Sequence, residues 1–323
     1  EDSKLPSEFN ITPYLNQSPA ANLLCVEVYR WSDGSFLEDQ DMTRYCGIFR
    51  DVTLWAKPKD GIWDFNVVTS HDEVEGWRLK VEVEADAVKL YDGKFNKVAD
   101  LTRDAQVPLF NLQPSAFNFR PWSAEDPYLY TLVIRKGDDI RCKRVGFKEQ
   151  KIVGHTFLVN GKPVKFKGVN RHECSADNGR TVSLDEMIAD VTLMKRYNVN
   201  TVRTCHYPDH HLWYDICDRY GIYVVAEANV EGHEPGYEEN GLGAYPEWTH
   251  SIVERNEPEQ PVRHDVVDGQ RDGARRRLPS GDCLSPQDRP IAPHSLGARQ
   301  QGRRCRQPHV SVRRMARGTR SVR

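Results

Sequence analysis

Residues 199–230 read VNTVRTCHYPDHHLWYDICDRYGIYVVAEANV, and this stretch decides the fold class. It opens with a short apolar strand, continues with an amphipathic helix and closes with a second strand rich in Val and Ala. Gly221 stands where the helix should end, because glycine readily adopts the left-handed conformation of a helix C-cap. A strand, a helix and a strand at this spacing predict a parallel βαβ unit.

The same pattern extends towards the N-terminus. Residues 183–198, SLDEMIADVTLMKRYN, start with Ser183 and Glu186 in the spacing of a capping box. Their apolar positions recur on one helical face, at Met187, Ile188, Val191 and Met194. A strand ending near Asn170 precedes this helix, and Asn160-Gly161 predicts a hairpin turn before it. Residues 151–256 are therefore predicted to hold about three βα units.

The residues before position 150 predict β structure. Residues 23–31, LLCVEVYRW, alternate apolar and polar side chains, and residues 48–58, IFRDVTLWAKP, form a second strand-like run. From 58 to 150, short alternating runs are broken by turn residues about every ten positions, which favours an antiparallel sandwich. The predicted domains are thus 1–57, 58–150 and 151–256.

Residues 257–323 differ in composition from the rest of the chain. They hold fifteen Arg and no Lys, Phe, Tyr, Trp or Asn, giving 15 basic and 7 acidic side chains, net +8. Residues 1–256 carry 30 basic and 40 acidic side chains, net −10. Few residues of this segment could enter a core, so it is predicted to be disordered.

Two further features bear on localisation. No apolar run is long enough to span a membrane. The eight cysteines are scattered without a CxxC pair, which is typical of free thiols in a reducing compartment. These features predict a cytoplasmic protein without a membrane partner, although Glu1 is not an initiator Met and a leader could precede it.

Polar side chains gather where the three predicted parallel strands end. These are Asn170, Arg171, His172 and Glu173 after the first strand, Arg203 and His206 after the second, and Glu227, Asn229, Glu231 and His233 after the third. The active sites of βα-repeat enzymes are built at the carboxyl ends of the strands. A single such His is more often a satisfied loop residue, but the combination predicts a ligand site.

In these residues the chain resembles the β-galactosidases of glycoside hydrolase family 2. The resemblance covers residues 1 to about 256 and rests on several segments in order. They are RWSDGSFLEDQD (30–41), GIFRDV (47–52), WSAEDPYLYTL (122–132), GVNRHE (168–173), VRTCHYP (202–208) and WYDICDRYGIYVVAEANVEGH (213–233). It implies a multidomain β plus α/β protein. Its parts would be the C-terminal part of a jelly-roll sugar-binding-like domain, an immunoglobulin-like sandwich and the opening of a TIM (β/α)8 barrel.

The resemblance also implies roles for individual residues. Asp33 would hold the galactose 6-hydroxyl and a Na⁺ ion, and His172 and His206 would hydrogen-bond sugar hydroxyls. Arg203 would sit beside the nucleophile. Glu231 and His233 would be Mg²⁺ ligands. Ala226 and the rearranged residues 232–235 depart from the family pattern. The implied partners are a β-galactoside such as lactose and further copies of the same chain, with no nucleic acid.

The two catalytic carboxylates of a retaining glycosidase stand about 5 Å apart. In the related enzymes the acid/base belongs to a W-S-x-G-N-E segment and the nucleophile follows much later, and neither motif occurs in this sequence. The codons possible for residues 261–273, read one base forward, permit P-S-V-M-M-W-S-M-G-N-E-T-G. Those for residues 287–294 permit K-T-D-R-S-R-P. We therefore interpret residues 257–323 as an out-of-frame translation.

Other interpretations remain open. Within the family, the parent enzyme could be a β-glucuronidase or another hydrolase. Alternatively, the chain could be a non-catalytic β-sandwich protein whose Arg-rich segment binds nucleic acid through phosphates. The lack of Lys and of aromatic stacking residues in that segment disfavours this second alternative.

Overall fold

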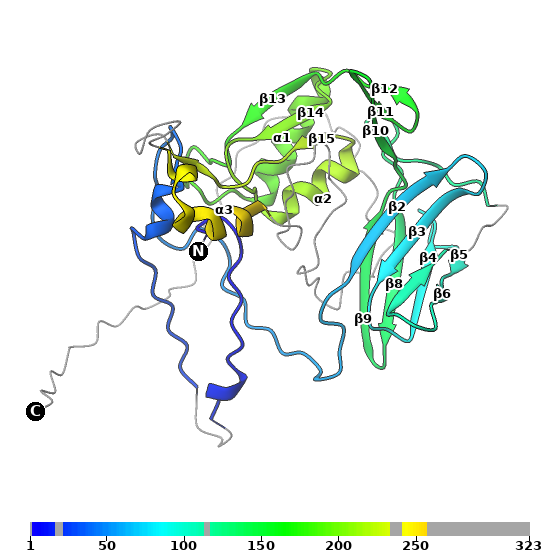
Figure 1. The fold of residues 1–323 in the computed structure, drawn as a ribbon, viewed down its shortest axis with the longest axis horizontal. Helices are drawn as coiled ribbons and strands as arrows, with labels where there is room; N and C mark the ends of the chain where they lie inside the picture. Colours follow the sequence, from blue (N-terminus) through cyan, green and yellow to red (C-terminus); the bar gives the residue numbers. More distant parts are fainter. Residues whose placement is uncertain (1, 17–21, 113–116, 233–240, 257–323) are drawn as a thin grey trace, which may run out of the picture. The chain divides into compact units, whose positions relative to one another are not determined.

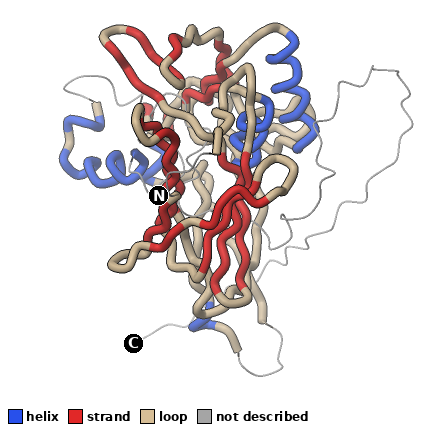
Figure 2. Tube along the Cα trace, turned by 90° about the vertical axis from the view of Figure 1, so that its right-hand side faces the viewer, coloured by secondary structure: helices blue, strands red, loops and turns tan. Residues whose placement is uncertain are grey.

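The computed structural model describes residues 2–16, 22–112, 117–232 and 241–256. Two antiparallel sheets lie between residues 66 and 145, where the sequence predicts a sandwich. One has the strand order β2-β3-β7-β6 and the other β5-β4-β8-β9. Figure 2 shows these strands as red tubes running alongside one another.

The strands of the two sheets have the following bounds. The first sheet contains β2 (Asn66–Asp72), β3 (Gly76–Glu82), β7 (Leu109–Asn111) and β6 (Thr102–Arg103). The second contains β5 (Lys97–Asp100), β4 (Ala87–Tyr91), β8 (Tyr130–Lys136) and β9 (Asp139–Val145).

One apolar core joins these sheets. In β3 the buried side chains Leu79 and Val81 alternate with exposed ones, and Leu132 and Ile134 of β8 are buried two positions apart. This period of two places every second side chain on the inner face of each sheet. The alternation read from the sequence therefore corresponds to the buried face of a sandwich.

A small antiparallel sheet follows, made of β10 (Gln150–Val153), β11 (Thr156–Val159) and β12 (Lys162–Pro163). The predicted turn between β11 and β12 is confirmed. Asn160 and Gly161 both have positive φ, 51° and 73°. A two-residue turn with positive φ at both positions matches the right-handed twist of the strands it joins.

The predicted βα units are also confirmed as local structure. β13 (Gly168–Arg171), β14 (Thr201–Thr204) and β15 (Tyr223–Val225) pair in parallel, with α1 (Leu184–Arg196) and α2 (His211–Tyr220) between them in sequence (Figure 1). The Ser183–Glu186 capping box is present at the start of α1. Gly221 ends α2 with φ 73°.

The helices cover the parallel sheet through one hydrophobic core. Met187 and Val191 of α1 pack with Trp213 of α2 and with Val202 and Val224 of the sheet. Ile188 and Met194 are partly buried at its margin, which confirms the helical face predicted for α1.

The strands predicted for residues 23–31 and 48–58 are wrong. Between residues 2 and 58 the described elements are two 3₁₀ turns, η1 (Thr12–Tyr14) and η2 (Asp33–Phe36), and the short strand β1 (Glu38–Asp39). A strand needs a neighbour for its backbone hydrogen bonds. Of the described residues here, only β1 has one, in β16 (Glu231–Gly232).

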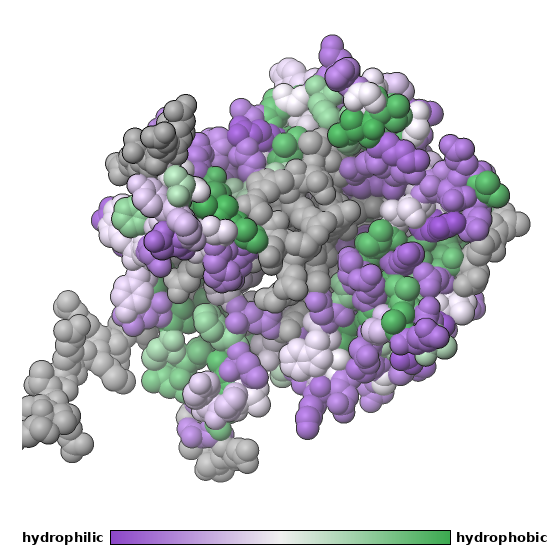
Figure 3. All heavy atoms as spheres, in the orientation of Figure 1, coloured by the Kyte–Doolittle hydropathy of each residue, from purple (hydrophilic) through white to green (hydrophobic). Residues whose placement is uncertain are grey.

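The apolar side chains that alternate along residues 23–31 are therefore not buried. Leu24, Val26 and Val28 are each about half exposed. Figure 3 shows hydrophobic side chains at the surface in the region where Figure 1 draws the N-terminal segment.

The remaining elements near the end of the described chain are short. They are η4 (Leu242–Ala244), η5 (Pro246–Trp248) and α3 (Thr249–Asn256). In the described ranges no helix combines the length and the apolar character that crossing a bilayer requires.

The cysteine prediction is only partly right. Cys25, Cys46, Cys174, Cys205 and Cys217 are free thiols, but Cys142 is disulfide-bonded. The predicted out-of-frame segment, 257–323, and His233 lie outside the described residues.

Candidate active site

The parallel register brings the predicted strand-end residues to one edge of the sheet. Asn170 of β13 lies opposite Arg203 of β14, and Arg203 lies opposite Val225 of β15. His206 and Glu227 follow these strands by two residues each. Because the carboxyl ends of parallel strands meet at one edge, side chains from three separate segments converge there.

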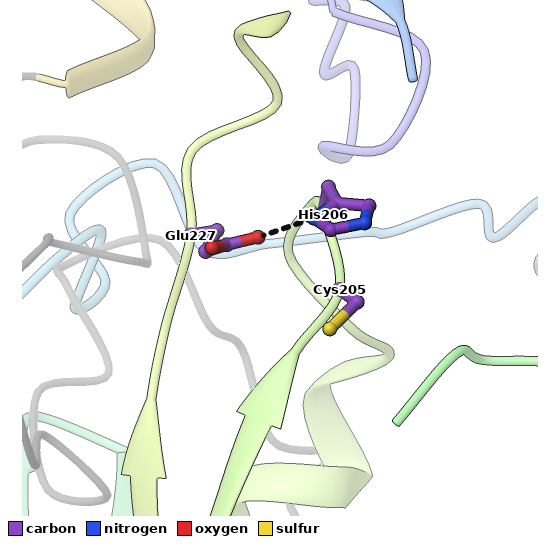
Figure 4. A group of neighbouring side chains, drawn as sticks. All are labelled: Cys205, His206 and Glu227. Atoms are coloured by element: carbon purple, nitrogen blue, oxygen red, sulfur yellow. Dashed lines mark hydrogen bonds and ion pairs between the residues drawn. The ribbon is translucent and has the colours of Figure 1, made fainter. Parts of the chain in front are cut away.

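Glu227 is the centre of this cluster. One carboxylate oxygen accepts a 2.6 Å hydrogen bond from Nε of Arg203, and Nη2 of the same guanidinium also contacts it. The other oxygen lies 3.0 Å from Nδ1 of His206. Figure 4 shows Glu227 directed towards His206 from the neighbouring strand end. The carboxylate therefore fixes the orientation of the guanidinium and of the imidazole together.

The two histidines of the site lie next to each other. The rings of His172 and His206 are 5.5 Å apart between centroids, in an edge-to-face arrangement. Partial desolvation of the ring lowers the pKa of His172, and the neighbouring His206, Arg180 and Arg203 lower it further. His172 is therefore neutral at pH 7, so its ring offers one donor and one acceptor, the pairing that sugar hydroxyls require.

The four residues 170–173 divide between the site and the interior. His172 is exposed at the strand end, whereas Arg171 and Glu173 are buried. Arg171 donates a 2.7 Å hydrogen bond to Asp209, and Glu173 accepts one of 2.8 Å from Arg50. Arg171 and Glu173, included in the predicted ligand site, thus belong to a buried charge network behind it.

The buried charge network contains Asp209, whose pKa is shifted. Burial raises the pKa of Asp209 to about 7, opposed by Arg171 and assisted by the negative charge of Glu173. Glu173 also accepts a 2.7 Å hydrogen bond from the backbone N–H of His210. The buried Glu173 and Asp209 therefore hold the loop after β14 through hydrogen bonds to His210 and Arg171.

The N-terminal segment contacts the residues that follow β15. β1 pairs in parallel with β16, and the backbone N–H of Glu231 donates a 2.7 Å hydrogen bond to the oxygen of Leu37. Nε2 of Gln40 donates a 2.7 Å hydrogen bond to Oδ1 of Asn229, and both side chains are buried. The hydrogen bond between Leu37 and Glu231, residues 194 positions apart, therefore helps to define the backbone position of Glu231.

Two predicted ligand residues, Glu231 and Asp33, make fewer contacts with the strand-end cluster. Glu231 has a carboxylate oxygen 3.9 Å from Nδ1 of His206. Asp33 begins η2, and its carboxylate accepts a hydrogen bond from the N–H of Gly34. No hydrogen bond or ion pair among the described residues joins Asp33 to the strand-end cluster.

Several residues around the site were not predicted from the sequence. Cys205 lies beside Arg203, with Nη1 of Arg203 3.4 Å from its sulfur. Hydrogen bonds of Arg50, Gln40 and Arg180 join the N-terminal segment to residues around the parallel sheet. Cys205 could have been noticed from its place next to His206, whereas the other contacts carry no local sequence signal.

Comparison with known proteins agrees with this architecture. The pattern of the glycosyl hydrolases family 2 TIM barrel domain matches residues 150–266, and that of the family's sugar binding domain matches residues 1–58. The chain belongs to glycosyl hydrolase family 2. It therefore shares its ancestry with a family of glycoside hydrolases, and its β and α/β parts follow that multidomain plan.

Curated relatives are β-galactosidases. That of Halalkalibacterium halodurans is 37% identical over 280 residues, covering 79% of this chain and 27% of the relative. That of Streptococcus thermophilus is 39% identical over 285 residues, with 79% and 27% covered. This family 2 chain thus spans between a quarter and a third of the length of the curated relatives it matches.

A solved structure shares the fold. A β-glucuronidase from Ruminococcus gnavus superposes with a TM-score of 0.55 at 23% identity, covering 66% of this chain and 38% of that one. At this identity the likeness concerns the fold alone.

Proposed function

We propose that the intact protein is a retaining β-galactosidase, which hydrolyses terminal non-reducing β-D-galactose residues by double displacement. The observation that carries this proposal is the convergence of His172, Arg203, His206 and Glu227 at one sheet edge, beside the backbone of Glu231. The neutral ring of His172, with His206 next to it, suits the neutral hydroxyls of a sugar, and the Arg203–Glu227 pair lies in reach of both rings. The curated relatives support galactose as the sugar.

In this proposal the described residues bind and orient the sugar. His172 and His206 would hydrogen-bond its hydroxyls, and Arg203, held by Glu227, would place positive charge beside the nucleophile. Asp33 would hold the 6-hydroxyl from the N-terminal segment. The general acid and the nucleophile would be two Glu residues that this sequence does not contain, so we expect the 323-residue chain to be inactive.

The finer domain assignment belongs to the same proposal. Residues 1–57 would be the C-terminal part of a jelly-roll sugar-binding domain, 58–150 an immunoglobulin-like sandwich, and 151–256 the first three βα units of the barrel. The half-exposed apolar side chains Leu24, Val26 and Val28 are consistent with a surface that further parts of such a domain would cover. The intact protein is proposed to be a cytoplasmic homo-oligomer that binds no nucleic acid.

Mg²⁺ and Na⁺ are proposed as cofactors. The carboxylate of Glu231 is a hard oxygen donor of the kind Mg²⁺ prefers, and it projects from a backbone fixed by β1. Glu231 and His233 would hold Mg²⁺, and Asp33 would hold Na⁺. When bound, Mg²⁺ would supply positive charge close to the general acid. Asp33 makes no ion pair with other described residues, which leaves its carboxylate suited to a monovalent cation.

The frame interpretation rests on the shifted-frame motifs and on how far the comparisons reach. The curated relatives cover 79% of the chain, a share equal to that of residues 1–256, and the family's barrel pattern ends at residue 266. Resequencing the DNA across the codons for residues 245–300 tests this interpretation. A one-base correction that restores W-S-M-G-N-E would remove the Arg-rich segment. An unchanged DNA sequence would contradict the frame interpretation.

The activity is tested with two proteins. The in-frame full-length product should hydrolyse a chromogenic β-galactoside at least tenfold faster than the matching β-glucuronide, and the 323-residue chain should hydrolyse neither above a mock preparation. Preference of the in-frame product for the glucuronide would instead support the β-glucuronidase alternative. Turnover of galactoside by the 323-residue chain would contradict our assignment of the catalytic carboxylates.

A further inference from the structure

Cys205, His206 and Glu227 bring three different ligand atoms together where β14 and β15 end. The thiol sulfur, a ring nitrogen and a carboxylate oxygen all lie within 4.8 Å of one another. Figure 4 shows Cys205 and His206 on one strand end and Glu227 on its neighbour, with the three side chains grouped between them. In the described ranges no other group of three such side chains is this close.

We propose that Cys205, His206 and Glu227 form a binding site for a thiophilic divalent cation such as Zn²⁺. Sulfur, imidazole nitrogen and carboxylate oxygen are the three ligand types that proteins offer Zn²⁺. The thiolate distinguishes this site from the Mg²⁺ position proposed at Glu231, because hard cations take oxygen ligands and not sulfur. The inference does not rest on the proposed glycosidase activity, and because Zn²⁺ would use His206 and Glu227 and displace Arg203, its binding would exclude the sugar from the site.

The spacing of the ligand atoms suits a tetrahedral ion. Bonds of about 2.0–2.3 Å place tetrahedral ligands about 3.3–3.8 Å from one another. The His206 Nδ1–Glu227 oxygen separation is 3.0 Å, so this pair needs to open only slightly. All ligand-atom separations are at most 4.8 Å, so the sulfur would have to approach by at most about 1 Å. A water molecule would complete the coordination.

A cationic side chain now contacts all three ligand groups. Arg203 neutralises Glu227, and its guanidinium also contacts the sulfur of Cys205 and Nδ1 of His206. A bound Zn²⁺ would replace Arg203 as the counter-charge, with one thiolate and one carboxylate balancing its two positive charges. The Arg203 side chain is 37% exposed, so it can turn into solvent when displaced.

Binding requires that the thiol lose its proton. On coordination the S–H proton leaves to the buffer and a Zn–S bond forms, with no change in oxidation state. Zinc affinity should therefore rise with pH.

The test is a titration of the complete 323-residue chain with Co²⁺, a spectroscopic stand-in for Zn²⁺, in excess Mg²⁺. Coordination by thiolate produces a sulfur-to-cobalt charge-transfer band, which a purely oxygen and nitrogen site lacks. We expect the band to disappear in Cys205→Ser and to persist in the matched control Cys217→Ser, which removes another buried thiol. All variants carry the same residues 257–323, so any cobalt bound there contributes equally to each spectrum. The difference between the wild-type and Cys205→Ser spectra therefore reports on Cys205.

A second measurement addresses the other two ligands. Zn²⁺ competition against Co²⁺ should show affinity falling more than about tenfold in Glu227→Gln and in His206→Gln. Circular dichroism and thermal melts establish that each variant is folded. If Cys205→Ser does not fold, Glu227→Gln still tests the proposal, because Glu227 is only partly buried and its replacement is conservative. An unchanged band in Cys205→Ser, or wild-type zinc affinity in folded Glu227→Gln, would overturn the proposal.

Discussion

Arg50 donates a 2.8 Å hydrogen bond to Glu173, whose side chain is only 2% exposed. The same guanidinium donates to the backbone oxygen of Pro208, so one side chain from the N-terminal segment contacts the loops after β13 and β14. The residue before Glu173 is His172 of the candidate site. The Arg50 contact therefore connects the N-terminal segment to the segments that carry the histidines.

Replacing Arg50 should destabilise the fold markedly. Arg50→Met leaves the buried Glu173 carboxylate without its charged partner, which should lower the free energy of unfolding by about 3 kcal/mol. Chemical denaturation measures this, with Arg78→Met as control. Arg78 pairs with Glu75 at the surface, where both side chains are about half exposed, and its loss should cost under about 1 kcal/mol.

A double mutant provides the decisive comparison for this ion pair. Arg50→Met combined with Glu173→Gln should cost less than the sum of the two single changes, because no buried charge is then left alone. Strict additivity of the two changes would show that the ion pair does not couple these segments.

Gly221 should tolerate no side chain. It ends α2 at φ 73°, and a Cβ atom there would collide with the backbone oxygen of Ala124. Gly221→Ala should therefore cost well over the roughly 1 kcal/mol of the positive φ alone. Gly137→Ala is the matched control, because Gly137 also has positive φ, but a Cβ added there would meet no atom within 4 Å. Equal costs at the two positions would contradict the packing of α2 against residue 124.

Asp209 should make stability depend on pH. Its pKa is about 7 in the folded protein and near 3.8 in the unfolded chain. Between these values the folded state holds a proton that the unfolded chain has released, so stability falls as the pH rises from about 4 to 7. Asp209→Asn cannot titrate and should flatten this decline in a urea series across the same pH range.

The control for this effect is Asp190→Asn. Asp190 also accepts from Arg171, at 3.0 Å, but its side chain is 46% exposed. Its replacement removes one partner of Arg171 but keeps the buried Asp209 carboxyl, so the decline caused by Asp209 should persist. A wild-type slope in Asp209→Asn would place the titrating group elsewhere.

The proposed Mg²⁺ site predicts a specific loss in the in-frame full-length protein. Glu231→Gln removes one charge from the ligand set and should weaken Mg²⁺ binding, measured by calorimetry, by at least about tenfold. Glu247→Gln, a change of the same kind at an exposed position in η5, should bind Mg²⁺ as the wild type does. Unaltered binding in Glu231→Gln would exclude Glu231 as a ligand.

Local features of this fold were predictable from the sequence. The Ser183–Glu186 capping box, the Asn160-Gly161 turn and the Gly221 helix end each depend on residues a few positions apart. The site residues His172, Arg203, His206 and Glu227 could be placed near one another for a related reason. Parallel strands end at one edge, so residues that follow such strands converge whatever the rest of the chain does.

The roles of residues within those segments were less predictable. Residues 170–173 all looked like ligand candidates, yet Arg171 and Glu173 are buried and paired with Asp209 and Arg50. Which side chain of an extended segment faces outward depends on the register of the strand, and this depends on its neighbours. The strands predicted at residues 23–31 and 48–58 are absent. Alternation of apolar and polar residues indicates which face of a strand could be buried, but a strand also needs a neighbour for its backbone hydrogen bonds.

The sequence by itself determined the class of this protein, the order of its β and α/β parts and the strand ends that carry the candidate site. These follow from hydrophobic period, capping and turn chemistry, which act over short distances along the chain. Only the tertiary structure decided that Glu227 joins Arg203 to His206 beside Cys205, and that Leu37 holds the backbone of Glu231. Such contacts join residues up to about 190 positions apart, and they form only when packing of the cores brings those segments together.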